Sequence, residues 1–101
     1  MLDSLNLQVF SEHLNTTFRV RVPQHPILPL ELSEVTEKNF VPHAEQFSLI
    51  FRSSASGYIP QGTYTFEHDK LGVFDLFLVP IGPDAIGMRY EVVFNRLRQP
   101  K

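Results

Sequence analysis

The chain has 101 residues, of which 43% are hydrophobic, 12% aromatic and 20% charged. This length indicates one domain with a core large enough to fold without metals or disulfides. Nine Lys and Arg against eleven Asp and Glu give a net charge of −2, without the basic surface of a nucleic-acid binder. Cysteine is absent, which excludes disulfides, thiolate metal sites and cysteine nucleophiles.

Three features of the sequence indicate where in the cell the protein is located. The first residues, 1–4, carry an acid and no basic group, so we expect no secretory signal peptide. The longest apolar run, 76–81, is far too short for a membrane-spanning helix. Together with the absence of cysteine, these features favour a cytoplasmic protein that has no membrane partner.

Residues 5–14 form the one segment with helical spacing. Leu7, Phe10 and Leu14 recur at intervals that place them on one apolar face. Asn6 can cap the start, and Asn15 can end the helix in a left-handed conformation. We predict a helix over 5–14 whose apolar face covers one open end of a sheet.

From residue 17 onward, apolar and polar residues alternate as in half-buried strands. The pattern predicts six strands, over residues 17–22, 28–36, 47–52, 63–68, 73–79 and 88–95, before a tail at 96–101. We therefore predict a single all-β domain over 1–101. Its strands would form an antiparallel meander, closed as a small barrel or folded into a two-layer sandwich.

Sequence signatures of catalysis are missing. The four histidines (His13, His25, His43 and His68) have no metal-ligand spacing, and there is no phosphate-binding loop or nucleophilic-serine motif. We predict no metal site, no cofactor and no catalytic residue. His68 is interpreted as a surface histidine at the start of a hairpin turn.

The predicted strand 73–79 is apolar on both faces, which is unusual for a monomeric barrel. Its inner face would carry Phe74, Leu76 and Leu78. The residues that stand out on the outer face of this and neighbouring strands are Ile50, Val73, Asp75, Phe77, Val79 and Val93. Either the helix or a loop covers them, or they meet a partner protein or a second copy of the chain. If both faces are buried, Asp75 needs a partner such as Arg52 or Arg89.

Several segments carry a resemblance to a known family. They are FSLIFR at 47–52, PQGTY at 60–64, EH at 67–68, LG at 71–72, LFLVPIGPD at 76–84 and GMRYEVVFN at 87–95. These segments, with a similar opening at 5–7, Phe10 and 17–18, resemble a family of short bacterial proteins known only as a domain of unknown function. The resemblance implies a stand-alone domain near phage-derived, tail-collar-like proteins, and it implies no catalytic residue.

Two functions from different classes are consistent with these observations. The first is a non-catalytic interaction or accessory module that binds protein through its outer β face, beside a phage-tail-like assembly if the resemblance holds. The second is a small-molecule-binding barrel with an aromatic-lined cavity formed by Phe51, Tyr64, Phe66 and Tyr90. A packed core would argue against the second. An enzyme ranks third, because it would need histidine and acidic side chains converging in a cleft.

Overall fold

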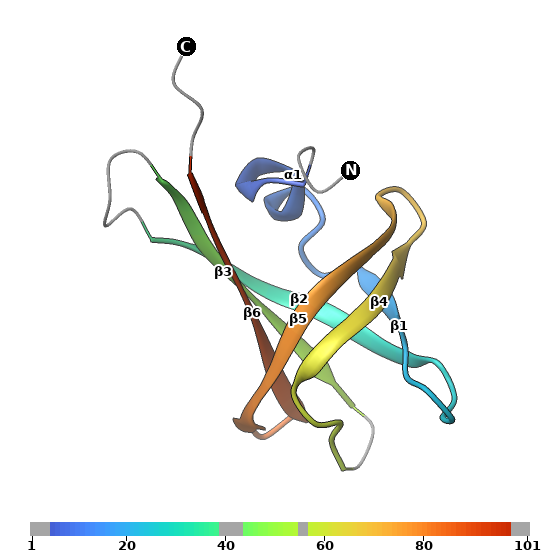
Figure 1. Cartoon of the computed structure of the whole chain (residues 1–101). Helices are drawn as coiled ribbons and strands as arrows, with labels where there is room; N and C mark the ends of the chain where they lie inside the picture. Colours follow the sequence, from blue (N-terminus) through green and yellow to red (C-terminus); the bar gives the residue numbers. More distant parts are fainter. Residues whose placement is uncertain (1–4, 39–43, 55–56, 98–101) are drawn as a thin grey trace.

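The computed structural model describes residues 5–38, 44–54 and 57–97. Six antiparallel strands form a closed barrel, and one short helix lies at its end (Figure 1). The elements are α1 (Leu7–Ser11), β1 (Thr17–Arg21), β2 (Leu28–Glu37), β3 (Ala44–Ser53), β4 (Gly62–His68), β5 (Gly72–Pro83) and β6 (Met88–Leu97). The prediction of an all-β barrel with one N-terminal helix is confirmed. No helix in the described part of the chain is long and apolar enough to cross a membrane.

The strand order around the barrel is β1-β2-β3-β6-β5-β4. Two three-stranded meanders, β1–β3 and β4–β6, are joined by antiparallel pairing of β3 with β6 and of β1 with β4. The order therefore departs from a single continuous meander. Because β3 and β4 lie on opposite sides of the ring, the connection between them must cross one end of the barrel.

Several element boundaries differ from the predicted ones. β5 continues to Pro83 instead of ending at Val79, because a register shift between Pro80 and Gly82 lets the strand pass the proline. Gly82 adopts a φ of 108°, which suits such an irregularity. β3 begins at Ala44, earlier than predicted, and β6 extends to Leu97, into the predicted tail. Residues 98–101 of that tail lie outside the described residues.

Helix α1 is shorter than the predicted 5–14, and of the two predicted caps only the N-cap is confirmed. The Asn6 side chain accepts a hydrogen bond from the Val9 amide at 2.9 Å. The C-cap is Glu12, so the prediction that Asn15 ends the helix is wrong, although Asn15 has the expected left-handed φ of 65°. Leu5, just before the cap, and Phe10 are both buried, as in a hydrophobic staple. Leu14 is exposed because the helix ends before it.

Phe10 closes the barrel end that α1 covers. Its side chain is fully buried, and its ring lies 5.5 Å from that of Phe94 and 6.1 Å from that of Phe47, measured between centroids. Phe18 and Phe74 complete the cluster, each 6.4 Å away. One residue of a short helix thus contacts β1, β3, β5 and β6. Since so short a helix is not stable alone, this packing must hold it in place.

The interpretation of His68 as a surface residue is wrong. The side chain is buried, and its ring centroid lies 4.4 Å from that of Phe18. Its Nδ1 accepts hydrogen bonds from the amides of Lys70 and Leu71, at 3.1 and 3.3 Å. Nε2 therefore carries the proton and donates it to the Thr16 hydroxyl at 3.0 Å. A second proton would have to enter at Nδ1, where two amide hydrogens already point.

Replacing Phe10 tests whether it holds the barrel end closed. We expect Phe10→Ala to lower the free energy of unfolding by about 3–5 kcal/mol, because it leaves a cavity among four aromatic rings. Leu14→Ala, at an exposed position just beyond α1, should change it by less than about 0.5 kcal/mol. Urea denaturation followed by circular dichroism measures both. Equal effects for the two variants would contradict this role.

The burial of His68 predicts a pH-dependent stability. Burial lowers the pKa of His68, the neighbouring His13, Arg19 and Lys70 lower it further, and Asp69 opposes them. The unfolded chain therefore takes up this proton first, and stability falls as the pH drops below the ordinary value of 6.5.

Urea denaturation at pH 7.5 and 5.0 measures this loss. His68→Asn retains an acceptor near the Nδ1 position and has no titrating ring, so the loss should be smaller in this variant. His25→Asn, at an exposed position, should lose as much stability as the unmodified chain. An undiminished loss in His68→Asn would show that His68 is not its source.

Candidate functional site

An open pocket lies at the barrel end opposite α1. Its volume is about 690 Å³, within the range of small-molecule sites. The loop between β1 and β2 forms one wall, and residues 57–60, just before β4, form the other. Three tyrosines and four prolines are among its lining residues. We call this the end pocket.

A tight turn shapes the first wall. The His25 amide donates to the Val22 carbonyl at 3.0 Å, and Gln24 has a φ of 64°. With Pro23 at the second position, this is the pattern of a type II turn, in which the third residue needs a positive φ. The turn directs the chain back toward β2 and leaves Ile27 exposed beside the end pocket.

Two tyrosine hydroxyls fix the second wall. Tyr64, on β4, donates to the Pro60 carbonyl at 2.6 Å. Tyr90, on β6, accepts from the Ile59 amide at 3.0 Å. Residues 59–60 are thereby tied to two strands of the barrel, whereas Tyr58 is 68% exposed. The end pocket therefore has a fixed rear wall and one accessible ring at its rim.

The electrostatic character of the end pocket is nearly neutral. Among the described residues its lining includes no Asp, Glu, Lys or Arg, and His25 is the only ionisable one besides the tyrosines. Burial raises the pKa of Tyr90, partly offset by the Ile59 amide, so its hydroxyl keeps its proton at neutral pH. No hydrogen bond formed among the described residues uses that proton, and Tyr90 is only 1% exposed. The arrangement can hold an uncharged apolar ligand.

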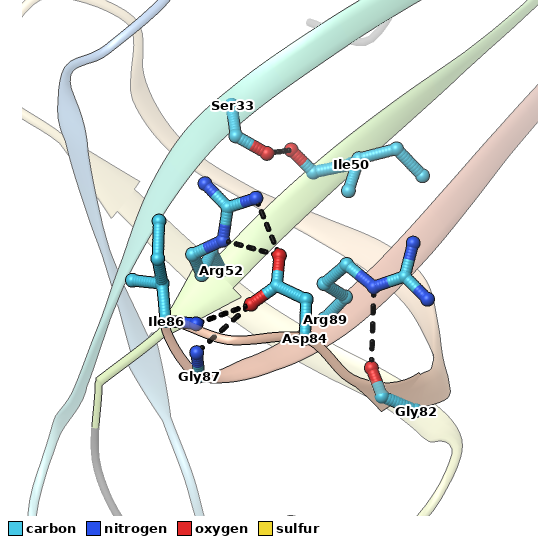
Figure 2. Close-up of polar contacts among 8 residues, drawn as sticks. All are labelled: Ser33, Ile50, Arg52, Gly82, Asp84, Ile86, Gly87 and Arg89. Atoms are coloured by element: carbon cyan, nitrogen blue, oxygen red, sulfur yellow. Dashed lines mark hydrogen bonds and ion pairs between the residues drawn. The ribbon is translucent and has the colours of Figure 1, made fainter.

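A paired cluster of charges stabilises the neighbouring β5–β6 turn (Figure 2). Arg52 Nη2 and Nε lie 2.6 and 3.0 Å from Asp84 Oδ2, while Asp84 Oδ1 accepts from the Ile86 and Gly87 amides at 2.9 Å. These donors, the Gly87 amide first, hold the pKa of Asp84 well below its usual range. A Cβ atom on Gly87 would lie 1.9 Å from the Ser53 carbonyl oxygen. This cluster positions a turn, and its hydrogen-bonding groups already have partners.

The four residues predicted to line a ligand cavity divide into two pairs. Tyr64 and Tyr90 line the end pocket. Phe51 and Phe66 are fully buried, with ring centroids 5.4 Å apart, and belong to the core instead. The barrel interior is therefore filled by its own side chains, as is usual at this size.

The proline-containing walls were not predicted from the sequence. The available signal was the concentration of prolines around the start of the strand that begins at residue 28, and another proline before residue 62. Only the crossing of the β3–β4 connection brings these two segments together, and periodicity does not reveal that crossing.

The residues predicted to form an interface lie on the barrel's outer surface. Val73, Phe77 and Val93 are 59%, 52% and 62% exposed, so neither α1 nor a described loop covers them. Ile50 and Val79 are half-buried. We call Val73, Phe77 and Val93 the outer face.

Asp75, also predicted at an interface, needs no buried ion pair. It is exposed and accepts a hydrogen bond from the Thr65 hydroxyl at 2.8 Å. The partners considered for it are engaged elsewhere, since Arg52 binds Asp84 and Arg89 donates to the Gly82 carbonyl (Figure 2).

The three histidines in the described part of the chain do not converge on a site with acidic groups. Within residues 5–38, 44–54 and 57–97, no group of three His, Cys, Asp or Glu residues could hold a metal ion. His13 and His68 lie near each other, with ring centroids 5.0 Å apart, but at the end that α1 covers. His43 lies outside the described residues.

Comparison with known proteins shows to which family the chain belongs. The model of a family described as "Domain of unknown function (DUF6916)" matches residues 5–94, which include α1, β1–β5 and most of β6. No curated protein and no solved structure matches the chain. The predicted resemblance to an uncharacterised family is confirmed, and the chain belongs to the DUF6916 family of domains of unknown function.

Proposed function

We propose that this protein is a non-catalytic binding module whose end pocket holds an uncharged, largely apolar ligand. The observation that carries the proposal is the end pocket itself, a space of about 690 Å³ with tyrosine and proline walls, whose described lining holds no acidic or basic side chain other than His25. Sites for small molecules are commonly concave and apolar, with few polar groups that fix orientation. Here those groups are the hydroxyls of Tyr64 and Tyr90.

The walls of the end pocket are well suited to binding because they lose little conformational freedom when a ligand binds. Proline rings have no freedom to lose, and a tyrosine side chain has only two rotatable bonds. The hydroxyls of Tyr64 and Tyr90 are already hydrogen-bonded to residues 59–60. A ligand that displaces water from these surfaces would gain about 25 cal/mol for each Å² of apolar area buried.

The same geometry favours binding over catalysis. General acid–base chemistry requires a positioned acid or base, usually oriented by a second polar group. His25 is exposed at the rim of the end pocket, and no carboxylate from the described part of the chain lines that pocket. The tyrosine hydroxyls hold backbone groups of the protein and are poorly placed to exchange protons with a substrate.

Titration with small neutral aromatic probes tests this function. We expect indole and p-cresol to shift the amide resonances of residues 57–59 and of the β1–β2 loop in 15N–1H correlation spectra. Tyr58→Ala should weaken indole binding about tenfold, because removing a ring contact is worth roughly 1 kcal/mol or more.

Phe77→Ala is the matched control, since it removes an exposed ring that does not line the end pocket and should leave indole binding unchanged. Shifts confined to the outer face, or no shifts at millimolar probe, would contradict the proposal.

A second candidate function is supported by the outer face. Val73, Phe77 and Val93 each leave more than half of their surface in solvent, and exposed apolar side chains on neighbouring strands favour protein contact. The proposal is that this face binds a protein partner or a second copy of the chain. A place beside a phage-tail-like assembly stays a prediction from the family resemblance. The outer face and the end pocket involve different residues, so either function can hold without the other.

Light scattering tests self-association through the outer face. We expect dimers to increase with concentration in the millimolar range, and Phe77→Asp to abolish them by placing a charge in the apolar contact. Tyr58→Asp introduces the same charge at an exposed ring of the end pocket and should have no such effect. A monomer at every concentration, unchanged by Phe77→Asp, would exclude self-association.

A further inference from the structure

We infer that a pH-sensitive latch closes the barrel end under α1, and that protonation of His68 opens it and lets α1 detach from the aromatic cluster beneath. The latch is a chain of hydrogen bonds that joins the β4–β5 turn to the last turn of α1, two segments at the same end of the barrel (Figure 1). It uses none of the residues that line the end pocket, so it does not depend on the proposed function.

Thr16 is the link between the two segments. Its hydroxyl accepts the Nε2 proton of His68 at 3.0 Å and donates its own proton to the His13 carbonyl at 2.6 Å. The His13 ring in turn donates from Nδ1 to the Val9 carbonyl within α1, at 2.8 Å. A single hydroxyl therefore connects the buried imidazole of His68 to the helix.

A second proton on His68 is incompatible with this chain of hydrogen bonds. In the neutral ring, Nδ1 accepts from the amides of Lys70 and Leu71, at 3.1 and 3.3 Å. An imidazolium carries hydrogen on both nitrogens and accepts nothing, so its Nδ1 proton would point at two amide hydrogens. The ring must then leave its position against Phe18, and the hydrogen bond to Thr16 is lost with it.

The groups around His68 favour opening over protonation in place. Burial lowers the pKa of His68. The neighbouring His13, Arg19 and Lys70, from the end of α1, from β1 and from the β4–β5 turn, lower it further. Asp69 opposes them, but it is exposed and already paired with Arg19 at 3.0 Å. The open state therefore takes up the proton first, so the latch is closed above the ordinary value of 6.5 and weakens as the pH falls below it.

The chain just beyond α1 provides a hinge. Asn15 and Thr16 are attached to β2, since the Asn15 amide donates to the Leu32 carbonyl at 2.7 Å and the Leu32 amide to the Thr16 carbonyl at 3.1 Å. α1 itself has only five residues and holds its shape only while Phe10 is packed beneath it. Weakening the latch therefore raises the fraction of molecules in which α1 is detached while the strands stay paired.

Hydrogen exchange of single amides tests the latch. The reporters are the amides of Phe10 and Glu12, both hydrogen-bonded in the helical turn. Their protection factors, which are corrected for the intrinsic effect of pH on exchange, are compared at pH 7.5 and 5.0. We expect them to be about three- to tenfold lower at pH 5.0, the range for one lost hydrogen bond. The Gly87 amide, held by Asp84 in the β5–β6 turn, should keep its protection.

Thr16→Val and Thr17→Val form a matched pair of variants. Thr16→Val removes the linking hydroxyl and leaves His68 in place. The protection of α1 should then already be about three- to tenfold lower at pH 7.5 and should depend much less on pH. Thr17→Val removes an exposed hydroxyl from the next residue and should behave like the unmodified chain. His68→Asn has no titrating ring, so its α1 protection should change little between the two pH values.

Three outcomes would overturn the latch. The first is α1 protection that stays the same at pH 7.5 and 5.0, even if the whole protein loses stability, because His68 would then be released only by global unfolding. The second is a fall of equal size at Gly87, which would show a general loss of protection. The third is an undiminished fall in His68→Asn, or no difference between Thr16→Val and Thr17→Val. None of them changes the test of the end pocket.

Discussion

Closure of the barrel places every strand between two hydrogen-bonded neighbours, and the other features of the molecule depend on this constraint. The pairing of β3 with β6 and of β1 with β4 puts β3 and β4 on opposite sides of the ring. The chain must then cross one end of the barrel between them. A short barrel has two ends that need cover, and this protein covers them differently: Phe10 of α1 packs into one, while residues 59–60 are held at the other by tyrosine hydroxyls. The first end is filled by packed side chains, whereas the second leaves the end pocket.

Much of the fold could be predicted from the sequence because it follows from local patterns. Alternation of apolar and polar residues located all six strands, and Asn6 marked the start of α1, whereas Asn15 lies beyond its C-cap, Glu12. The errors have local causes as well. β5 passes Pro80 through a register shift that no simple sequence pattern predicts. His68 is buried because the β4–β5 turn folds its amides onto the imidazole ring.

The candidate site was only half predictable. The alternation of inward and outward residues along each strand correctly placed Phe51, Tyr64, Phe66 and Tyr90 on inward faces. It does not indicate how far along the barrel axis each residue lies. Phe51 and Phe66 lie deep in the core, whereas Tyr64 and Tyr90 lie near the open end. The walls that complete the end pocket come from residues 22–29 and 57–60, which are brought together only by long-range strand pairing. The exposed outer face, by contrast, was predicted at Val73, Phe77 and Val93 from a single strand pattern and its neighbours.

The central claim is that the end pocket binds an uncharged, largely apolar ligand. A crystal structure of the protein grown with indole tests it most directly. We predict density for indole between the β1–β2 loop and residues 57–60. Indole bound elsewhere on the barrel, or an empty end pocket at saturating indole, would contradict it.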